Sequence, residues 1–330
     1  MAQVRGQPAD IGCRGPPPCG TVRHVPSHAA HAKDDMDHRT TRPVRPTRRP
    51  GLLAGALMSH LRRLGPSGLV GLLALLAGSA AAQVQELKVG GTGAALGTMR
   101  RLAQAYTATR PDMRITVLPS MGSGGGIKAV LAGAIQIALS SRALSDAEVR
   151  AGAVETEYGR TPLVFATAAA STVAGITSRQ LVDWYAGSSE QWPDGSKLRL
   201  VLRPVGDSDT EAIKAMSPAM HDAATMAEQR KGMNFALTDQ DAATALEKVT
   251  GALGLSTLAQ IVSEKRALKA LVLDGVAPGI EALARERYPL HKRLALVSGP
   301  KSPPAAQDFI AFVRSPEGRE LLRQTGHWVK

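Results

Sequence analysis

The stretch Pro119–Ala134, with the sequence PSMGSGGGIKAVLAGA, decides how the chain is interpreted. Four glycines and Ser123 stand directly before a segment that carries Ile127, Val130 and Leu131 at helical spacing. Unpaired N–H groups and the positive end of the helix dipole favour an anion at such a helix start, and glycines let the backbone come close to it. The stretch therefore predicts an anion-binding loop. A nucleotide site and an ordinary glycine turn are the alternatives.

Strand and helix patterns alternate on both sides of this loop. ELKVGG, RITVLP and IQIALSS indicate strands over 86–91, 114–119 and 135–141, and single helices separate them. Further strands are predicted in LRLVLRPV, KALVLDGV and RLALVSG, and one helix from Pro304 to about Gln324. Strands separated by single helices are typical of a parallel α/β architecture. The loops after the first three strands, at Thr92, at 122–126 and at 140–142, should then lie at one carboxyl edge of the sheet, where ligands bind.

Nucleotide and enzyme sites find little support. GGTGAALG follows the first strand, but the second strand ends in VLPS, without the acidic residue that would hold a ribose. GSGGGIKA lacks the Gly-Lys-Ser/Thr of a phosphate-binding P-loop, and Met121 replaces the first glycine of a nucleophile elbow. His221, His291 and His327 are far apart and outside the predicted anion loops. We therefore expect no catalytic residues, no metal and no cofactor.

The first 82 residues read differently from the rest. Residues 1–57 are rich in Arg, Pro and His without a helical or strand period, and we interpret them as a disordered or non-native extension. Residues 58–82 have a basic start, a short apolar run and small residues, as in a signal peptide; a membrane anchor is the alternative. Cleavage after Ala82 would leave a periplasmic protein starting at Gln83.

Removing this region changes the bulk properties of the chain. Residues 1–82 carry 11 Lys/Arg and 4 Asp/Glu, which is +7 of the total charge of +12. The remaining part is only mildly basic, so nucleic acid is not an expected partner. Cys13 and Cys19 also lie in this region, so the predicted mature chain has no disulfide, thiol nucleophile or cysteine metal site.

A series of motifs resembles one known family. GSGGGIKAVLAGAIQIALSSRALSDAE, LVDWYAGSSEQWPDG, LVLRPVGDSDTEAI, LVLDGVAPG, RYPLHKRLALV and FIAFVRSPEGRELLRQTG resemble, in order, segments of the phosphate-binding proteins of bacterial ABC importers. The resemblance covers nearly all of 86–326. It implies the type II periplasmic binding protein fold, an α/β fold of two lobes with a ligand cleft between them. Lobe I would comprise 83–167 and 278–330, and lobe II 168–277, with hinges near 168–172 and 274–278.

The resemblance also implies the site and the partners. The ligand would be a small oxyanion, with phosphate favoured, handed to ABC permease subunits, which would be the only link to a membrane. Arg203 would clamp the anion from lobe II, and Thr92 would offer its hydroxyl and its N–H. The implied ligand-binding residues are Thr92, Gly93, Ser123, Gly124, Gly125, Ser140, Ser141, Arg142, Arg203, Asp207, Ser208, Asp209 and Thr210.

Two departures from the family pattern bear on the ligand. The family usually has an aspartate where this chain has Ser141, and that carboxylate accepts the proton of hydrogen phosphate. Asp209 stands where a glycine is usual, and Asp207 or Asp209 could replace the missing acceptor or could cap the next helix, a role favoured for Asp209. Alternative functions are a receptor for sulfate or another oxyanion, a secreted phosphate-ester hydrolase and an envelope protein. Ser141 and Arg142 could equally be helix-capping residues, and Arg203 a surface arginine.

Overall fold

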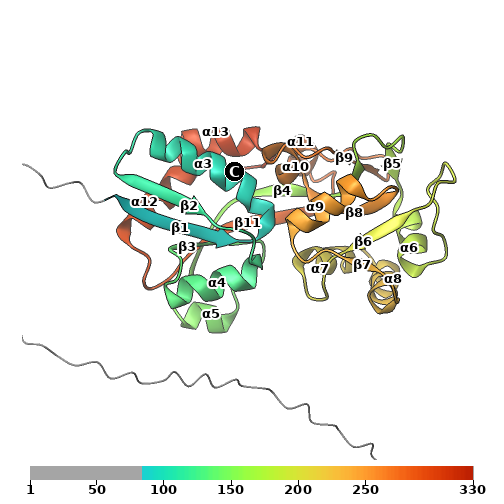
Figure 1. Cartoon of the computed structure of the whole chain (residues 1–330), viewed down its shortest axis with the longest axis horizontal. Coiled ribbons are helices and arrows are strands. Elements are labelled where there is room, and N and C mark those ends of the chain that lie inside the picture. Colours follow the sequence, from blue (N-terminus) through green and yellow to red (C-terminus); the bar gives the residue numbers. More distant parts are fainter. Residues whose placement is uncertain (1–83, 330) are drawn as a thin grey trace, which may run out of the picture. The chain divides into compact units, whose positions relative to one another are not determined.

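The computed structural model describes residues 84–329 (Figure 1). The extension predicted at 1–57, the signal peptide predicted at 58–82 and its cleavage point lie outside the described residues. Within 84–329 no helix is both long enough and apolar enough to span a bilayer.

One large mixed sheet runs through the structure. Its nine strands have the order β2-β1-β3-β11-β4-β8-β6-β7, with β9 joined to β4. They are β1 (Gln85–Gly91), β2 (Met113–Val117), β3 (Ile137–Ser140), β4 (Val154–Ala168), β6 (Arg199–Leu202), β7 (Asn234–Phe235), β8 (Ala252–Thr257), β9 (Leu268–Ala270) and β11 (His291–Ser298). A separate pair is formed by β5 (Gly175–Ile176) and β10 (Val272–Leu273).

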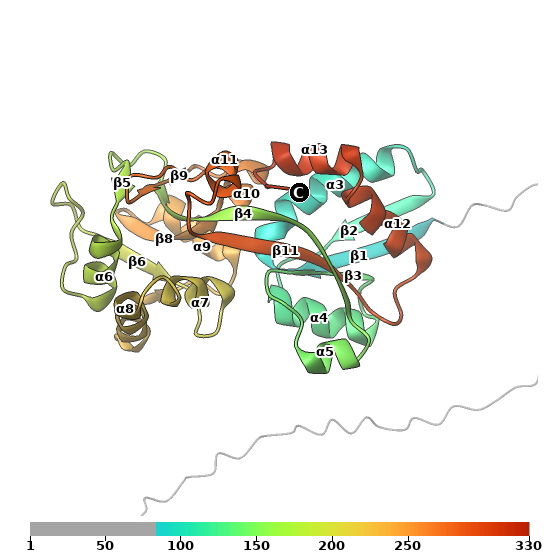
Figure 2. The same cartoon turned by 180° about the vertical axis from the view of Figure 1, so that it is seen from behind.

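Helices cover both faces of this sheet. In the part around β1, β2 and β3, α3, α12 and α13 pack on one side and α4 and α5 on the other (Figures 1 and 2). The helices are η1 (Gly93–Ala95), α3 (Leu96–Ala108), α4 (Gly122–Ala132), α5 (Asp146–Arg150), α6 (Ser178–Ala186), α7 (Ser208–Lys214), α8 (Pro218–Gln229), α9 (Asp239–Lys248), α10 (Leu258–Ser263), α11 (Ile280–Ala284), α12 (Pro304–Val313) and α13 (Pro316–Gln324).

The predicted parallel pairing is confirmed for part of the sheet. β1 pairs in parallel with β2 and with β3, and β6 pairs in parallel with β7 and β8. The two long strands β4 and β11 run antiparallel to their neighbours, however, so the sheet is mixed. β4, β7 and β8 were not among the predicted strands.

Strand β4 pairs with different neighbours in its two halves and so belongs to two regions of the structure. Its residues from Val154 to Pro162 pair with β11, and those from Leu163 to Ala166 pair with β8 (Figure 2). We call the part built on β1–β3, β11, α3–α5, α12 and α13 lobe I, and the part built on β5–β10 and α6–α11 lobe II. Separate hydrophobic cores fill them: Tyr106 and Phe309 lie in that of lobe I, and Trp184 and Trp192 in that of lobe II.

The glycine stretch forms a helix that lies unusually close to β1. Ile127 and Val130 of α4 are fully buried, as their spacing predicts. A Cβ on Gly126 would lie 2.8 Å from the Cα of Gly91, so only glycine allows this approach. The C-terminus of α4 is closed by Gly133 at φ 79°. Residues that predict an anion loop thus also fix the packing of α4 on the sheet.

The long helix predicted from Pro304 to Gln324 is wrong in one respect. The chain breaks into α12 and α13 at Arg314 and Ser315. Ser315 accepts a hydrogen bond from the Gly318 N–H as the N-cap of α13, and Pro316 occupies its first turn. Proline has no N–H to continue α12 but fits the start of a new helix, which explains the break.

Candidate functional site

The three loops predicted to share one edge do so. Because β1, β2 and β3 are parallel, Thr92, the start of α4 and Ser141 all follow carboxyl ends of neighbouring strands. The first turn of α4 has no side-chain cap, since Met121 stands at the N-cap position and makes no capping hydrogen bond. The free N–H groups of a helix start are therefore presented there, next to Ser123 and Gly124.

Hydroxyl groups from both lobes meet at this edge. Ser123 Oγ lies 3.1 Å from Ser141 Oγ and accepts a hydrogen bond of 3.0 Å from the Ser141 N–H. Ser141 Oγ in turn lies 3.1 Å from Ser208 Oγ, at the first residue of α7 in lobe II. All three serines are half-buried. The geometry brings together three of the predicted site residues from three separate segments of the chain.

Arg203 is held among carboxylates rather than exposed. Its Nη1 donates to the Ala236 carbonyl oxygen at 2.7 Å, and its Nη2 donates to Asp207 Oδ2 at 2.9 Å and lies 3.8 Å from Asp239 Oδ2. Only 6% of the residue is exposed, so the surface-arginine interpretation is wrong. Its Nε is buried without a hydrogen-bond partner. Burial opposes its charge, but Asp239 and Asp207 outweigh this and raise the pKa of Arg203.

Asp207 and Asp209 have different roles. Asp207 is the N-cap of α7: its Oδ1 accepts a 3.0 Å hydrogen bond from the Asp209 N–H. Asp209 does not cap the helix, contrary to the interpretation favoured from the sequence. Its carboxylate is 2.5 Å from Lys292 Nζ, and only 2% of the residue is exposed. Asp207 is half-buried and stands beside Ser208, so it is the more accessible of the two carboxylates.

Two residues of this network, Asp239 and Lys292, were not predicted from the sequence. Lys292 of β11 lies between Asp209 and Asp239, with its Nζ 3.4 Å from Asp239 Oδ1. Burial alone would lower the pKa of Lys292, but both carboxylates outweigh it and raise the pKa. Burial also tends to raise the pKa of Asp239, but Lys292 and Arg203 outweigh it and keep the pKa low. No specific signal in the sequence points to Lys292, because it stands between His291 and Arg293 in a polar start to β11.

Several predicted site residues have their polar groups bound within the protein. Arg142 forms two hydrogen bonds, of 2.9 and 2.7 Å, with Glu148 of α5, and lowers the pKa of Glu148 to about 2. Ser145, and neither Ser141 nor Arg142, is the N-cap of α5. Ser140 Oγ donates to the Arg142 carbonyl oxygen at 2.7 Å. Thr210 Oγ1 donates to the carbonyl oxygens of residues 203 and 204.

Thr92 and Gly93 lie where lobe I contacts α9. The Thr92 N–H donates to the Leu139 carbonyl oxygen at 3.0 Å, so it is not free for a ligand, contrary to expectation. The Thr92 hydroxyl makes no capping hydrogen bond to η1. Gly93 accepts a 2.9 Å hydrogen bond from Gln240 Nε2, and a Cβ there would lie 2.6 Å from Asp239 Oδ2. Gly93 thus permits contact between the lobes.

Most of the chain matches one family of known proteins. The model of the PBP superfamily domain matches residues 77–317. The chain belongs to the PBP superfamily. Members of this family bind substrates for transport, and the chain is accordingly not an enzyme.

Individual relatives are distant. A phosphate-binding protein PstS of Borreliella burgdorferi is 21% identical over 252 residues, which cover 73% of this chain and 88% of the relative. Among solved structures, a Clostridium perfringens protein described as a phosphate ABC transporter substrate-binding protein, with bound phosphate, has a TM-score of 0.64 at 20% identity. An ABC-type phosphate transport receptor from Vibrio cholerae has a TM-score of 0.53 at 18% identity. Each alignment covers 74% of this chain and 100% of the other. At such identities the structural likeness shows the two-lobed α/β fold alone.

The described residues offer no obvious metal site. Within 84–329 no group of three or more His, Cys, Asp or Glu side chains is placed to hold a metal ion. His327 is fully buried in lobe I beside Tyr158, with ring centroids 5.8 Å apart, and His221 is exposed in lobe II. At the carboxyl edge, the polar groups that the described residues offer to a ligand are hydroxyls, backbone N–H groups and the accessible carboxylate of Asp207.

Proposed function

We propose that the chain is a receptor that binds inorganic phosphate between its lobes, in the periplasm, and delivers it to an ABC importer. The phosphate-binding relatives support this ligand. The arrangement of the described residues supports it independently, because the groups that converge at the carboxyl edge are those suited to a small oxyanion: hydroxyls and the N–H groups of a helix start.

The observation that carries the proposal is the chain of hydroxyls from Ser123 through Ser141 to Ser208. Each serine comes from a different segment, and Ser208 belongs to the other lobe. Each hydroxyl can donate one hydrogen bond and accept others. A tetrahedral anion placed among them would accept a hydrogen bond from each, replacing the direct contact between Ser141 and Ser208. Binding would thereby connect the two lobes.

Arg203 supports the anion mainly through its charge. Both of its terminal nitrogens already donate to protein acceptors, at the Ala236 carbonyl and at Asp207. One N–H of each terminal nitrogen is thus committed to the protein, and these contacts hold the guanidinium in place. In the proposed site its positive charge offsets the negative charge of the Asp207 carboxylate, which belongs to the residue before Ser208. Removing Arg203 would leave a negative site that repels phosphate.

Asp207 is the proposed acceptor for the proton of hydrogen phosphate. Each oxygen of an ionised carboxylate has two acceptor positions, and each oxygen of Asp207 uses one of them, for Arg203 and for the Asp209 N–H. Asp209 is buried against Lys292 and is less suited to this role. Sulfate has no such proton, so a carboxylate at this position would favour hydrogen phosphate over sulfate.

Location and transport partner follow from the same proposal. Export by the segment 58–82 would place the protein in the periplasm, where it would meet the permease subunits. Membrane contact would occur only through the permease.

Calorimetric titration of the purified protein with phosphate and with sulfate tests the ligand. We expect phosphate to bind more tightly. Ser208→Ala and Ser123→Ala should each weaken phosphate binding by roughly fivefold to tenfold, because each removes one hydrogen bond of about 1 to 1.5 kcal/mol. The exposed Ser188→Ala is the matched control and should leave the affinity unchanged.

Asp207→Asn tests the basis of selectivity. It should reduce the preference for phosphate over sulfate at neutral pH, whereas the exposed Asp222→Asn should not. Sulfate binding to the unmodified protein at least as tightly as phosphate would favour a sulfate receptor instead. Absence of binding for both anions would count against an oxyanion receptor of either kind.

A further inference from the structure

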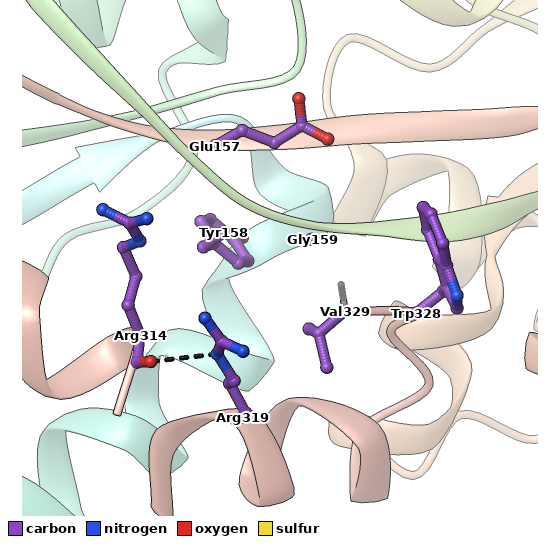
Figure 3. A pocket seen from close by; sticks show the side chains of 7 residues that line it. All are labelled: Glu157, Tyr158, Gly159, Arg314, Arg319, Trp328 and Val329. Carbon is purple, nitrogen blue, oxygen red and sulfur yellow. Dashed lines mark hydrogen bonds between the residues drawn. The ribbon is translucent and has the colours of Figure 1, made fainter. Parts of the chain in front are cut away.

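A cavity of about 260 Å³ lies in lobe I, on elements other than those of the serine site. None of the residues proposed to bind the oxyanion lines it. The bulged region of β4, the turn between α12 and α13 and the segment after α13 surround it (Figure 3). Its lining residues are Glu157, Tyr158, Gly159, Arg314, Arg319, Trp328 and Val329.

Two guanidinium groups at this cavity have no acidic partner within residues 84–329. Arg319 is oriented by its Nε, which donates to the Arg314 carbonyl oxygen at 3.0 Å (Figure 3). This leaves both of its terminal nitrogens for another acceptor. Arg323, one turn further along α13, differs in this respect, because it lies 3.3 Å from Glu320. The cavity therefore concentrates positive charge that the described part of the chain does not neutralise.

Among the described residues that line the cavity, Glu157 is the only one with a carboxylate, and it does not compensate for this charge. Glu157 Oε1 accepts a 2.9 Å hydrogen bond from Arg160, and Oε2 accepts one of 2.8 Å from Arg293. Burial would raise the pKa of Glu157, but these two arginines outweigh it and lower the pKa. Glu157 thus remains ionised and engaged with other cations, and Arg314 and Arg319 are left for an external anion.

The remaining walls of the cavity are flat and mostly apolar. The register of β4 against β11 shifts between Leu294 and Ala295, so Tyr158 is the extra residue of a β-bulge, a feature that re-aims side chains. The Tyr158 hydroxyl is buried without a hydrogen-bond partner. Trp328 and Val329 complete the wall, and the Arg160 guanidinium lies 5.9 Å from the Trp328 ring. In the view of Figure 3 the two guanidinium groups lie on one side and the Trp328 ring on the other.

We propose that this cavity is a second binding site, for a small organic carboxylate with a flat apolar body such as a single aromatic ring. The carboxylate binds Arg319 and Arg314, since the guanidinium fork matches a carboxylate in two parallel hydrogen bonds. The ring lies against Tyr158, Trp328 and Val329. The volume equals that of about nine water molecules, which suits one ring with one acid group. The proposal does not depend on phosphate binding at the serine site.

Titration with benzoate tests this site, followed by calorimetry and by tryptophan fluorescence. Trp328 is half-buried at the cavity, whereas Trp184 and Trp192 are buried in lobe II, so a fluorescence change reports mainly on Trp328. Benzoate should bind, and benzamide, which has the same shape without the charge, should bind at least tenfold more weakly. Inorganic phosphate should not displace benzoate at a similar concentration.

Variants separate this site from a general effect of charge. Arg319→Ala should weaken benzoate binding at least tenfold and Arg314→Ala severalfold, while the matched control Arg323→Ala leaves it unchanged; phosphate affinity should not change in any of the three. If circular dichroism shows that Arg319→Ala is unfolded, Arg319→Lys, which keeps the charge but not the fork, should still weaken binding. No benzoate binding at millimolar concentration, equal binding of benzamide, displacement by phosphate, or unchanged affinity in the folded Arg319 variant would each overturn the proposal.

Discussion

Lys292 is the side chain on which the buried ion network depends. Its Nζ lies 2.5 Å from Asp209 and 3.4 Å from Asp239, and all three residues are buried. Lys292→Met leaves two buried carboxylates without this cation, so the free energy of unfolding should fall by about 3 to 5 kcal/mol. Urea denaturation measures the change. The exposed Lys88→Met should alter it by less than about 0.5 kcal/mol, and an equally small effect at Lys292 would contradict this network.

His327 makes stability depend on pH. Burial lowers its pKa from the ordinary 6.5 to about 4. Between these values the unfolded chain binds a proton that the folded chain does not, so stability falls as the pH falls from 6.5 towards 4. Between pH 7 and pH 5, His327 should account for a loss of about 2 kcal/mol.

Urea denaturation of His327→Gln at both pH values measures this contribution. The variant should lose about 2 kcal/mol less than the unmodified protein between pH 7 and pH 5. The exposed His221→Gln serves as the control and should keep the full pH dependence. An unchanged pH dependence in His327→Gln would show that His327 is accessible to protons in the folded state.

At the scale of elements, the packing of α4 against β1 depends on Gly126. A Cβ there would lie 2.8 Å from Gly91 Cα and 2.9 Å from the Gly90 carbonyl oxygen. Gly126→Ala should therefore destabilise the fold by about 1 to 3 kcal/mol. Gly124 is the matched control in the same helix, since the nearest atom to its Cβ is Arg142 Nη2 at 3.9 Å.

Thermal and urea denaturation compare the two alanine variants. Gly124→Ala should be neutral or stabilising by up to about 1 kcal/mol, because alanine favours the helix and meets no obstacle. Equal destabilisation by both substitutions would mean that the close approach of α4 to β1 does not limit the residue at position 126.

The first three strands predicted from the sequence are confirmed. The strands over 86–91, 114–119 and 135–141 correspond to β1, β2 and β3, because each is a short apolar run bounded by turn residues. β4 was missed because its first half, VETEYGR, carries charged side chains. These charges are stabilised by ion pairs with β11 and within β4 itself. Arg293 of β11 is 136 residues from Glu157 and 138 from Glu155, and local patterns do not reveal such a distant partner.

The site was predicted unevenly for a similar reason. Ser123 and Ser141 could be inferred to meet because parallel strands bring their loops to one edge, whereas Ser208 was expected there only from the resemblance to the phosphate-binding family. Whether a polar group is free depends on tertiary contacts. Sequence spacing gave no sign that Arg142 turns to Glu148, or that Lys292 pairs with Asp209.

For the whole molecule, we propose that the lobes rotate about β4 and β11. Pairing of β4 changes from β11 to β8 between Pro162 and Leu163, and the Leu163 N–H donates to the Leu290 carbonyl oxygen. The hinges expected near 168–172 and 274–278 lie further into lobe II. We therefore propose that lobe II begins near 163 and that the chain returns to lobe I near 291.

Phosphate should favour the closed arrangement. The Ser141–Ser208 contact at the proposed site is one hydrogen bond between neutral groups, whereas a bound anion would connect both lobes through charge-assisted bonds. Small-angle X-ray scattering should therefore show a smaller radius of gyration with phosphate than without it. An unchanged radius at saturating phosphate would contradict ligand-driven closure.

A crystal structure of the protein grown with phosphate would show directly whether the three serines bind the anion. We expect a tetrahedral anion within hydrogen-bond distance of Ser123, Ser141 and Ser208, with Asp207 facing one of its oxygens. The direct hydrogen bond between Ser141 and Ser208 should be replaced by bonds to the anion. Unbroken contact between these serines, with phosphate absent from them or bound elsewhere at saturating concentration, would show that they do not form the phosphate site.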